Sequence, residues 1–161
     1  MNGFQNVTME EILQDIAGRH PNGEALVFPD TGLRQSYREF HAACRAVAKG
    51  FMALGVQKGD RVSVWTTNLP EWVHMQFGLG MIGAVLVTIN TNYKSSELEY
   101  ILSQSESTTL VLIEGYRDTS FYDMIRETAT ELKWSLPGKL KSHRLPCLKN
   151  VVYLGRRKET P

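Results

Sequence analysis

The feature that most constrains this chain is a regular alternation, from Arg61 onward, of short apolar segments with helical patterns. The predicted strands, rich in Val, Leu and Ile, are Ala25–Phe28, Arg61–Thr66, Ala84–Ile89, Thr109–Ile113 and Asn150–Leu154. The later ones are almost continuously apolar, which is typical of strands covered on both faces. Strands that alternate with helices indicate βαβ units with right-handed crossovers. We therefore predict an α/β fold with three layers: a largely parallel sheet with helices on both faces.

Capping signals mark the helix starts. Residues 8–11 (Thr-Met-Glu-Glu) and 36–39 (Ser-Tyr-Arg-Glu) match the capping box, in which a hydroxyl and a carboxylate bond each other's backbone N–H groups. Asn68 precedes Pro70, which suits the first turn because its missing N–H costs nothing there. We expect Asn68 to cap that helix, and a fourth helix to begin at Ser96.

In the first sixty residues, one glycine marks the end of a predicted helix and another marks a predicted hairpin turn. An apolar stripe predicts a long helix after Ser36, and its members are Tyr37, Phe40, Cys44, Val47, Phe51 and Leu54. Gly55 suits the position just after this helix. The turn Pro29–Gly32 predicts a small hairpin in which Gly32 has a positive φ.

We expect a single domain over residues 1–161, which is part of something larger. Residues 1–58 form the N-terminal helices and hairpin, 59–155 a βαβ core, and 156–161 a truncated tail. Because that tail carries no terminating signal, we expect the chain to be a piece of a larger protein, truncated by design or by proteolysis.

Composition excludes several classes of protein. The net charge of +1 gives no global attraction to nucleic acid or to a membrane. No apolar run approaches the ~18 residues of a transmembrane helix, and the start resembles no secretory signal. The 2 cysteines are too few for a disulfide framework, so we expect a cytoplasmic protein.

Several apparent motifs are better explained by structure. Gly78–Gly83 matches G-x-G-x-x-G, but these glycines close a helix and precede a strand, whereas a dinucleotide fingerprint opens a helix. We expect helix–sheet packing there, with Gly83 as the helix stop. The four histidines show no metal-ligand spacing, and no nucleophile elbow is present. Lys139, Lys141, His143 and Arg144 lie in a predicted surface loop without interleaved aromatics, which favours a solvated face over a nucleic-acid site.

Polar residues follow three predicted strands, at Thr66–Asn68, Asn90–Tyr93 and Glu114–Arg117. Ligands of open α/β sheets gather at the carboxyl ends of strands. A receiver-type domain would need an acidic cluster there, and Asp118 is displaced into the following loop. Polar strand ends can also simply cap the next helix.

An ordered set of segments resembles the early N-terminal region of AMP-forming acyl-CoA synthetases, the superfamily that includes luciferase and peptide-synthetase adenylation domains. The segments are 36–40, 53–56, 59–72, 81–90, 95–102 and 145–152, and the resemblance covers residues 8–155. It is strongest to the fatty-acyl-CoA ligases. Such enzymes use ATP with Mg²⁺ to convert a fatty acid into an acyl-adenylate and pyrophosphate, and CoA then displaces AMP.

The resemblance also implies what this chain lacks. The family's Gly-rich phosphate loop, its ribose-binding Asp and its catalytic Lys lie beyond residue 161. We therefore expect no catalytic and no metal-binding residues here, and no tightly bound cofactor. In acetate-activating relatives, positions that correspond to Asn90, Thr91, Asn92, Tyr93 and Arg117 lie along the CoA path. The expected partners are the rest of the polypeptide and, in the whole enzyme, fatty acid, ATP and CoA, with a homodimer also expected.

Two alternatives remain open at this point. The chain could be a self-sufficient flavodoxin-like module that binds a small nucleotide or flavin. It could instead be a non-enzymatic oligomerisation unit, with the segment before Thr8 exchanged between protomers.

Overall fold

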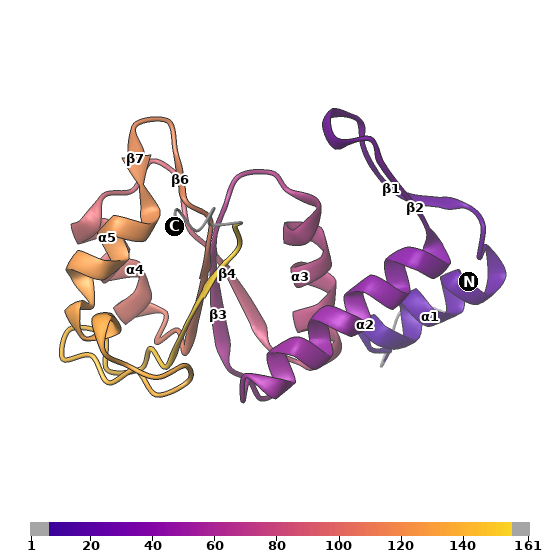
Figure 1. Cartoon of the computed structure of the whole chain (residues 1–161). Coiled ribbons are helices and arrows are strands. Elements are labelled where there is room, and N and C mark those ends of the chain that lie inside the picture. Colours follow the sequence, from indigo (N-terminus) through magenta and orange to yellow (C-terminus); the bar gives the residue numbers. More distant parts are fainter. Residues whose placement is uncertain (1–6, 156–161) are drawn as a thin grey trace. The chain divides into compact units, whose positions relative to one another are not determined.

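The computed structural model describes residues 7–155 and divides into two compact units (Figure 1). Unit 1 comprises the chain up to Gly59 together with Leu69–Ala84, and unit 2 comprises Asp60–Asn68 and the chain from Val85 onward. This grouping assigns one helix of the predicted range 59–155 to unit 1. The predicted domain division itself stays a prediction, and the predicted tail 156–161 lies outside the described residues.

Unit 1 is built from helices and one hairpin. Its elements are α1 (Met9–Arg19), β1 (Glu24–Phe28), η1 (Pro29–Thr31), β2 (Leu33–Ser36), α2 (Tyr37–Ala53) and α3 (Pro70–Met81). β1 and β2 pair antiparallel, as predicted. Both predicted capping boxes are formed: the N–H of Thr8 donates to Glu11 at 2.6 Å and that of Ser36 donates to Glu39 at 2.8 Å. These backbone hydrogen bonds are the main reason that the pKa of each glutamate is lowered.

The predicted turn glycine, Gly32, has the expected positive φ, of +69°. Gly55 and Gly83 follow their helices as predicted, with φ of +87° and +69°. Two helix starts differ from prediction. α3 is capped by Leu69 and not by Asn68, because Pro70 at the first helical position leaves the residue before it extended. α4 begins at Ser95, one residue early.

The core of unit 1 lies where its helices meet. Leu13, Phe40 and Cys44 are buried against partly buried side chains of α3, and burial raises the pKa of the Cys44 thiol to about 12. Gly78 packs so closely on α2 that a Cβ there would lie 2.9 Å from the carbonyl oxygen of Cys44. The glycine-rich segment therefore packs helix against helix in unit 1, rather than helix against sheet as predicted.

Unit 2 contains a parallel sheet of four strands in the order β4-β3-β5-β8 (Figure 1). Its elements are β3 (Arg61–Trp65), β4 (Val85–Thr88), α4 (Ser95–Gln104), β5 (Thr109–Leu112), β6 (Gly115–Tyr116), β7 (Thr119–Ser120), α5 (Phe121–Thr128), η2 (Thr130–Lys133) and β8 (Asn150–Tyr153). All of β5 is buried, as expected for a central parallel strand. The predicted α/β class, with a parallel sheet and flanking helices, is confirmed. The short β6–β7 hairpin was not predicted.

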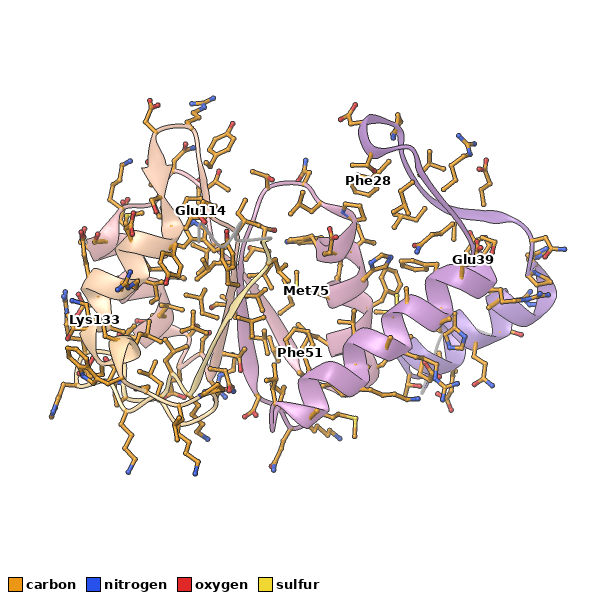
Figure 2. All side chains as sticks on the ribbon, in the orientation of Figure 1. Phe28, Glu39, Phe51, Met75, Glu114 and Lys133 are labelled. Carbon is orange, nitrogen blue, oxygen red and sulfur yellow. The ribbon has the colours of Figure 1, made fainter. Side chains whose placement is uncertain are left out.

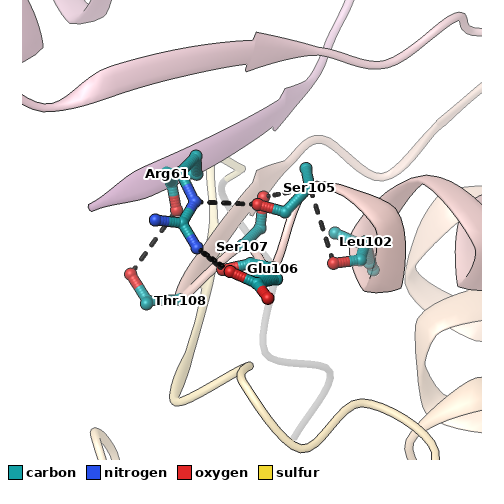
Figure 3. Close-up of polar contacts among 6 residues, drawn as sticks. All are labelled: Arg61, Leu102, Ser105, Glu106, Ser107 and Thr108. Carbon is teal, nitrogen blue, oxygen red and sulfur yellow. Dashed lines mark hydrogen bonds and ion pairs between the residues drawn. The ribbon is translucent and has the colours of Figure 1, made fainter. Parts of the chain in front are cut away.

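The amino ends of the strands are tied together by polar contacts (Figure 3). The guanidinium of Arg61 donates to the carbonyl of Ser105 at 2.8 Å and to the carboxylate of Glu106 at 2.6 Å. The hydroxyls of Ser63 and Ser107 are 2.7 Å apart and both residues are buried. These contacts fix the start of β3 against the turn that leads into β5.

Candidate functional site

The candidate site is the carboxyl edge of the parallel sheet, which lies wholly in unit 2. Parallel strands end at the same edge, so the loops after β3, β4 and β5 emerge together there. Glu114, labelled in Figure 2, lies near this edge, whereas Lys133 lies toward the opposite end of the unit. Within residues 7–155, no group of three or more His, Cys, Asp or Glu side chains is placed to hold a metal ion.

Trp65, the last residue of β3, organises this edge. Its side chain is fully buried and stacks on the ring of Phe121 with the centroids 3.8 Å apart. Its indole N–H donates to the carbonyl oxygen of Asn90 at 3.0 Å. One buried ring thus positions both the loop after β4 and the start of α5.

The predicted loop Asn90–Tyr93 is a compact turn. The side-chain oxygen of Asn90 accepts from the N–H of Asn92 at 2.9 Å, and the backbone oxygen of Asn90 accepts from the N–H of Tyr93 at 3.1 Å. Asn90 and Asn92 are exposed, while Thr91 and Tyr93 are partly buried. The amide of Asn90 is therefore engaged in shaping the loop, and Asn92 is the exposed polar side chain that it presents.

The loop and the hairpin are joined by a residue that the sequence did not single out. Lys94 donates from its ammonium group to the hydroxyl of Thr119 at 2.7 Å. The β6–β7 turn is tight because Gly115 faces the Thr119 carbonyl, which a Cβ would approach to 2.1 Å. The structure therefore brings the two predicted segments to one edge, through Lys94.

Arg117 occupies the tip of this hairpin. It adopts a left-handed conformation with φ of +52°, is exposed, and its guanidinium lies 5.0 Å from the centre of the Tyr116 ring. Below it, the hydroxyl of Tyr153 donates to the carboxylate of Glu114, which ties β8 to the strand end. A planar cation on an aromatic ring at an exposed edge is chemically suited to a phosphate group. The donors at this edge thus fit an anionic ligand such as CoA, and the assignment of Asn90–Tyr93 and Arg117 to a CoA path stays a prediction.

Known proteins that resemble this chain are AMP-binding enzymes, acyl-CoA synthetases and acyl-CoA ligases. The family model described as AMP-binding enzyme matches residues 13–159. YngI of Bacillus subtilis (strain 168), provisionally named an acyl-CoA synthetase, is 42% identical over 151 residues, which is 94% of this chain and 28% of that protein. The mitochondrial medium-chain acyl-CoA ligase ACSF2 of Danio rerio is 34% identical over 149 residues, 92% of this chain and 25% of that protein.

A solved structure shares the fold. The inhibitor-bound N-terminal domain of FACL13 from Mycobacterium tuberculosis superimposes with a TM-score of 0.73 at 25% identity, over 91% of this chain and 33% of that one. The chain therefore spans about a quarter of the length of the two relatives, with 28% and 25% covered.

Proposed function

Because the chain belongs to the AMP-binding enzyme family, we propose that it is the N-terminal portion of an ATP-dependent fatty-acyl-CoA ligase. The family match over residues 13–159, together with relatives named as acyl-CoA synthetases and ligases, carries this proposal. In the whole enzyme, a fatty carboxylate attacks the α-phosphorus of ATP, and pyrophosphate leaves. The thiolate of CoA then attacks the acyl carbonyl, forms the thioester and displaces AMP. Mg²⁺ bound to ATP in the whole enzyme would supply charge neutralisation to the phosphates in the first step.

In this proposal the chain's own role is to support the carboxyl edge of the sheet and to position CoA there. The buried core of unit 2 holds the carboxyl edge rigid, through Trp65 and the fully buried Leu110 and Leu112. The exposed guanidinium of Arg117 binds a phosphate of CoA, and the Asn90–Tyr93 turn lines the path beside it. The Lys94–Thr119 hydrogen bond supports this arrangement because it holds the two segments together.

The first experiment uses the complete reading frame that encodes the chain. We expect that protein to form acyl-CoA from ATP, CoA and fatty acids of graded length, and the 161-residue chain to show no ATP–pyrophosphate exchange above a vector control. A reading frame that ends at Pro161, or exchange by the chain alone, would contradict the proposal.

A second experiment addresses the CoA path. Arg117→Gln in the complete protein should raise the KM for CoA by at least about tenfold, since a charge-assisted hydrogen bond contributes ~1.5–3 kcal/mol. The KM for ATP should stay unchanged. Arg38→Gln, which removes another exposed arginine, from α2, is the matched control. Equal KM values for CoA in the two variants would remove Arg117 from the path.

We place the protein in the cytoplasm and expect it to form a homodimer. The free thiols of Cys44 and Cys147 support a reducing compartment. Sedimentation at several concentrations tests the dimer, and a strict monomer at the highest concentration would exclude it.

A further inference from the structure

The segment that runs from the last residue of η2 to the start of β8 concentrates positive charge. Lys133–Lys149, which we name the basic loop, contains five Lys and Arg residues and no Asp or Glu, in a chain whose net charge is only +1. The loop leads into β8 at the amino edge of the sheet, where the N–H of Lys149 donates to the carbonyl of Thr108 at 2.8 Å. It therefore lies at the edge opposite to the candidate site.

Buried residues hold the basic loop in place and turn its cations outward. Leu140 and Ser142 are buried, whereas the alternating Lys139, Lys141 and His143 are exposed. Further along, Leu145 and Leu148 also belong to the buried core of unit 2. The cations are thus presented on a fixed backbone, and little ordering is needed before they bind a partner.

Most of these charges are available to a partner. Arg144 is paired with Glu99, and the Glu131 carboxylate accepts from the backbone N–H of His143 at 3.1 Å. The ion pairs found within residues 7–155 include none of the lysines of the loop. Lys139, Lys141 and Lys149 line an open hollow of about 690 Å³ that contains no acidic side chain.

Large apolar side chains project from the same loop. Trp134 is 78% exposed and Leu136 is 67% exposed. The Lys133 ammonium lies 6.0 Å from the centre of the Trp134 ring, and the N–H of Lys139 donates to the carbonyl of Leu136 at 3.0 Å. An aromatic and an aliphatic side chain therefore stand directly beside the cations.

We propose that the basic loop binds the surface of an anionic lipid bilayer. Lysines beside an exposed tryptophan match that surface, because ammonium groups bind acidic headgroups while the indole lies at the interface with the acyl chains. Packing of an uncharged protein segment over the loop would remove the lysines from water without a countercharge, at a high cost. A lipid headgroup layer leaves them hydrated. The inference does not depend on ligase activity, since it uses only residues of the opposite edge.

The test is sedimentation of the chain with large vesicles. Binding is expected to vesicles with about 30% phosphatidylglycerol in phosphatidylcholine, and it should be lost in phosphatidylcholine alone or in about 0.5 M salt. Lys139→Gln with Lys141→Gln should weaken partitioning about 25-fold, at roughly fivefold per lysine. Lys49→Gln with Lys58→Gln makes the same change of charge on exposed residues of unit 1 and should leave partitioning nearly unchanged.

Trp134 provides a second readout. Lipids brominated on the acyl chains should quench the fluorescence of the wild-type chain, and Trp134→Phe should abolish that quenching. If the two double-lysine variants lose vesicle partitioning equally, net charge alone explains the binding, and the proposal is overturned. Binding to RNA without binding to vesicles would overturn it too, as would quenching that persists in Trp134→Phe.

Discussion

Gly78→Ala should destabilise the protein even though alanine favours helices. In α3 a Cβ at this position would lie 2.9 Å from the Cys44 carbonyl oxygen, 3.0 Å from a methyl of Val47 and 3.2 Å from the Ala48 nitrogen. Two of these three atoms are backbone, so α2 and α3 must separate by a few tenths of an ångström. Overpacking of this kind costs ~1–3 kcal/mol, whereas alanine in place of glycine gains ~1 kcal/mol in a helix. The net effect is a loss of up to about 2 kcal/mol.

Gly80→Ala is the matched control within the same helix. The three atoms nearest to a Cβ there all belong to the side chain of Met9, the closest at 3.4 Å. Both variants gain the same helix propensity, so the difference between their free energies of unfolding measures the overpacking alone, at about 1–3 kcal/mol. Urea unfolding followed by circular dichroism gives both values. If Gly78→Ala is as stable as Gly80→Ala, the close approach of α2 and α3 is wrong.

Three further perturbations test other contacts. Arg61→Ala should lower the free energy of unfolding by about 1–2 kcal/mol. The loss should exceed that of Glu106→Gln, because the arginine also satisfies a backbone carbonyl. A lower urea midpoint for Glu106→Gln than for Arg61→Ala would contradict this. Burial lowers the pKa of His74, so protonation favours the unfolded chain, and stability should fall as the pH drops below about 6.5. Replacement of His74 by Gln should flatten the unfolding profile between about pH 7.5 and 5.5, and an unchanged slope would show that other groups cause it. Trp65→Phe should cost about 1–3 kcal/mol and increase hydrogen exchange at the loop that begins with Asn90; unchanged exchange would mean that the indole N–H does not hold the loop.

Local signals were enough to predict most of the secondary structure. The capping boxes at Thr8 and Ser36 involve residues three apart, so their chemistry is complete in the sequence. The partner of Gly78 was predicted wrongly, because which helix approaches a glycine is decided by tertiary packing. The β6–β7 hairpin escaped prediction because its turn places Arg117, rather than a glycine, at positive φ.

The candidate site shows the same limit. Polar strand ends could be predicted, because the parallel order of strands follows from their alternation with helices. The hydrogen bond from Lys94 to Thr119 could not, since it joins side chains that are 25 residues apart. The basic loop was recognised as a surface loop, but the sequence did not show that Leu140 and Ser142 are buried and turn the lysines to one side.

The two proposed surfaces of unit 2 are separated by the length of its strands. β3 runs from Arg61 to Trp65, and a rise of ~3.3 Å per residue sets the two edges of the sheet roughly 15 Å apart. At physiological salt the Debye length is ~8 Å, so the lysines of the basic loop exert little force on an anion at Arg117. Each surface must therefore recognise its ligand with its own groups. When the basic loop lies on a bilayer, the carboxyl edge of this rigid sheet faces away from the lipid, where a water-soluble nucleotide can reach it.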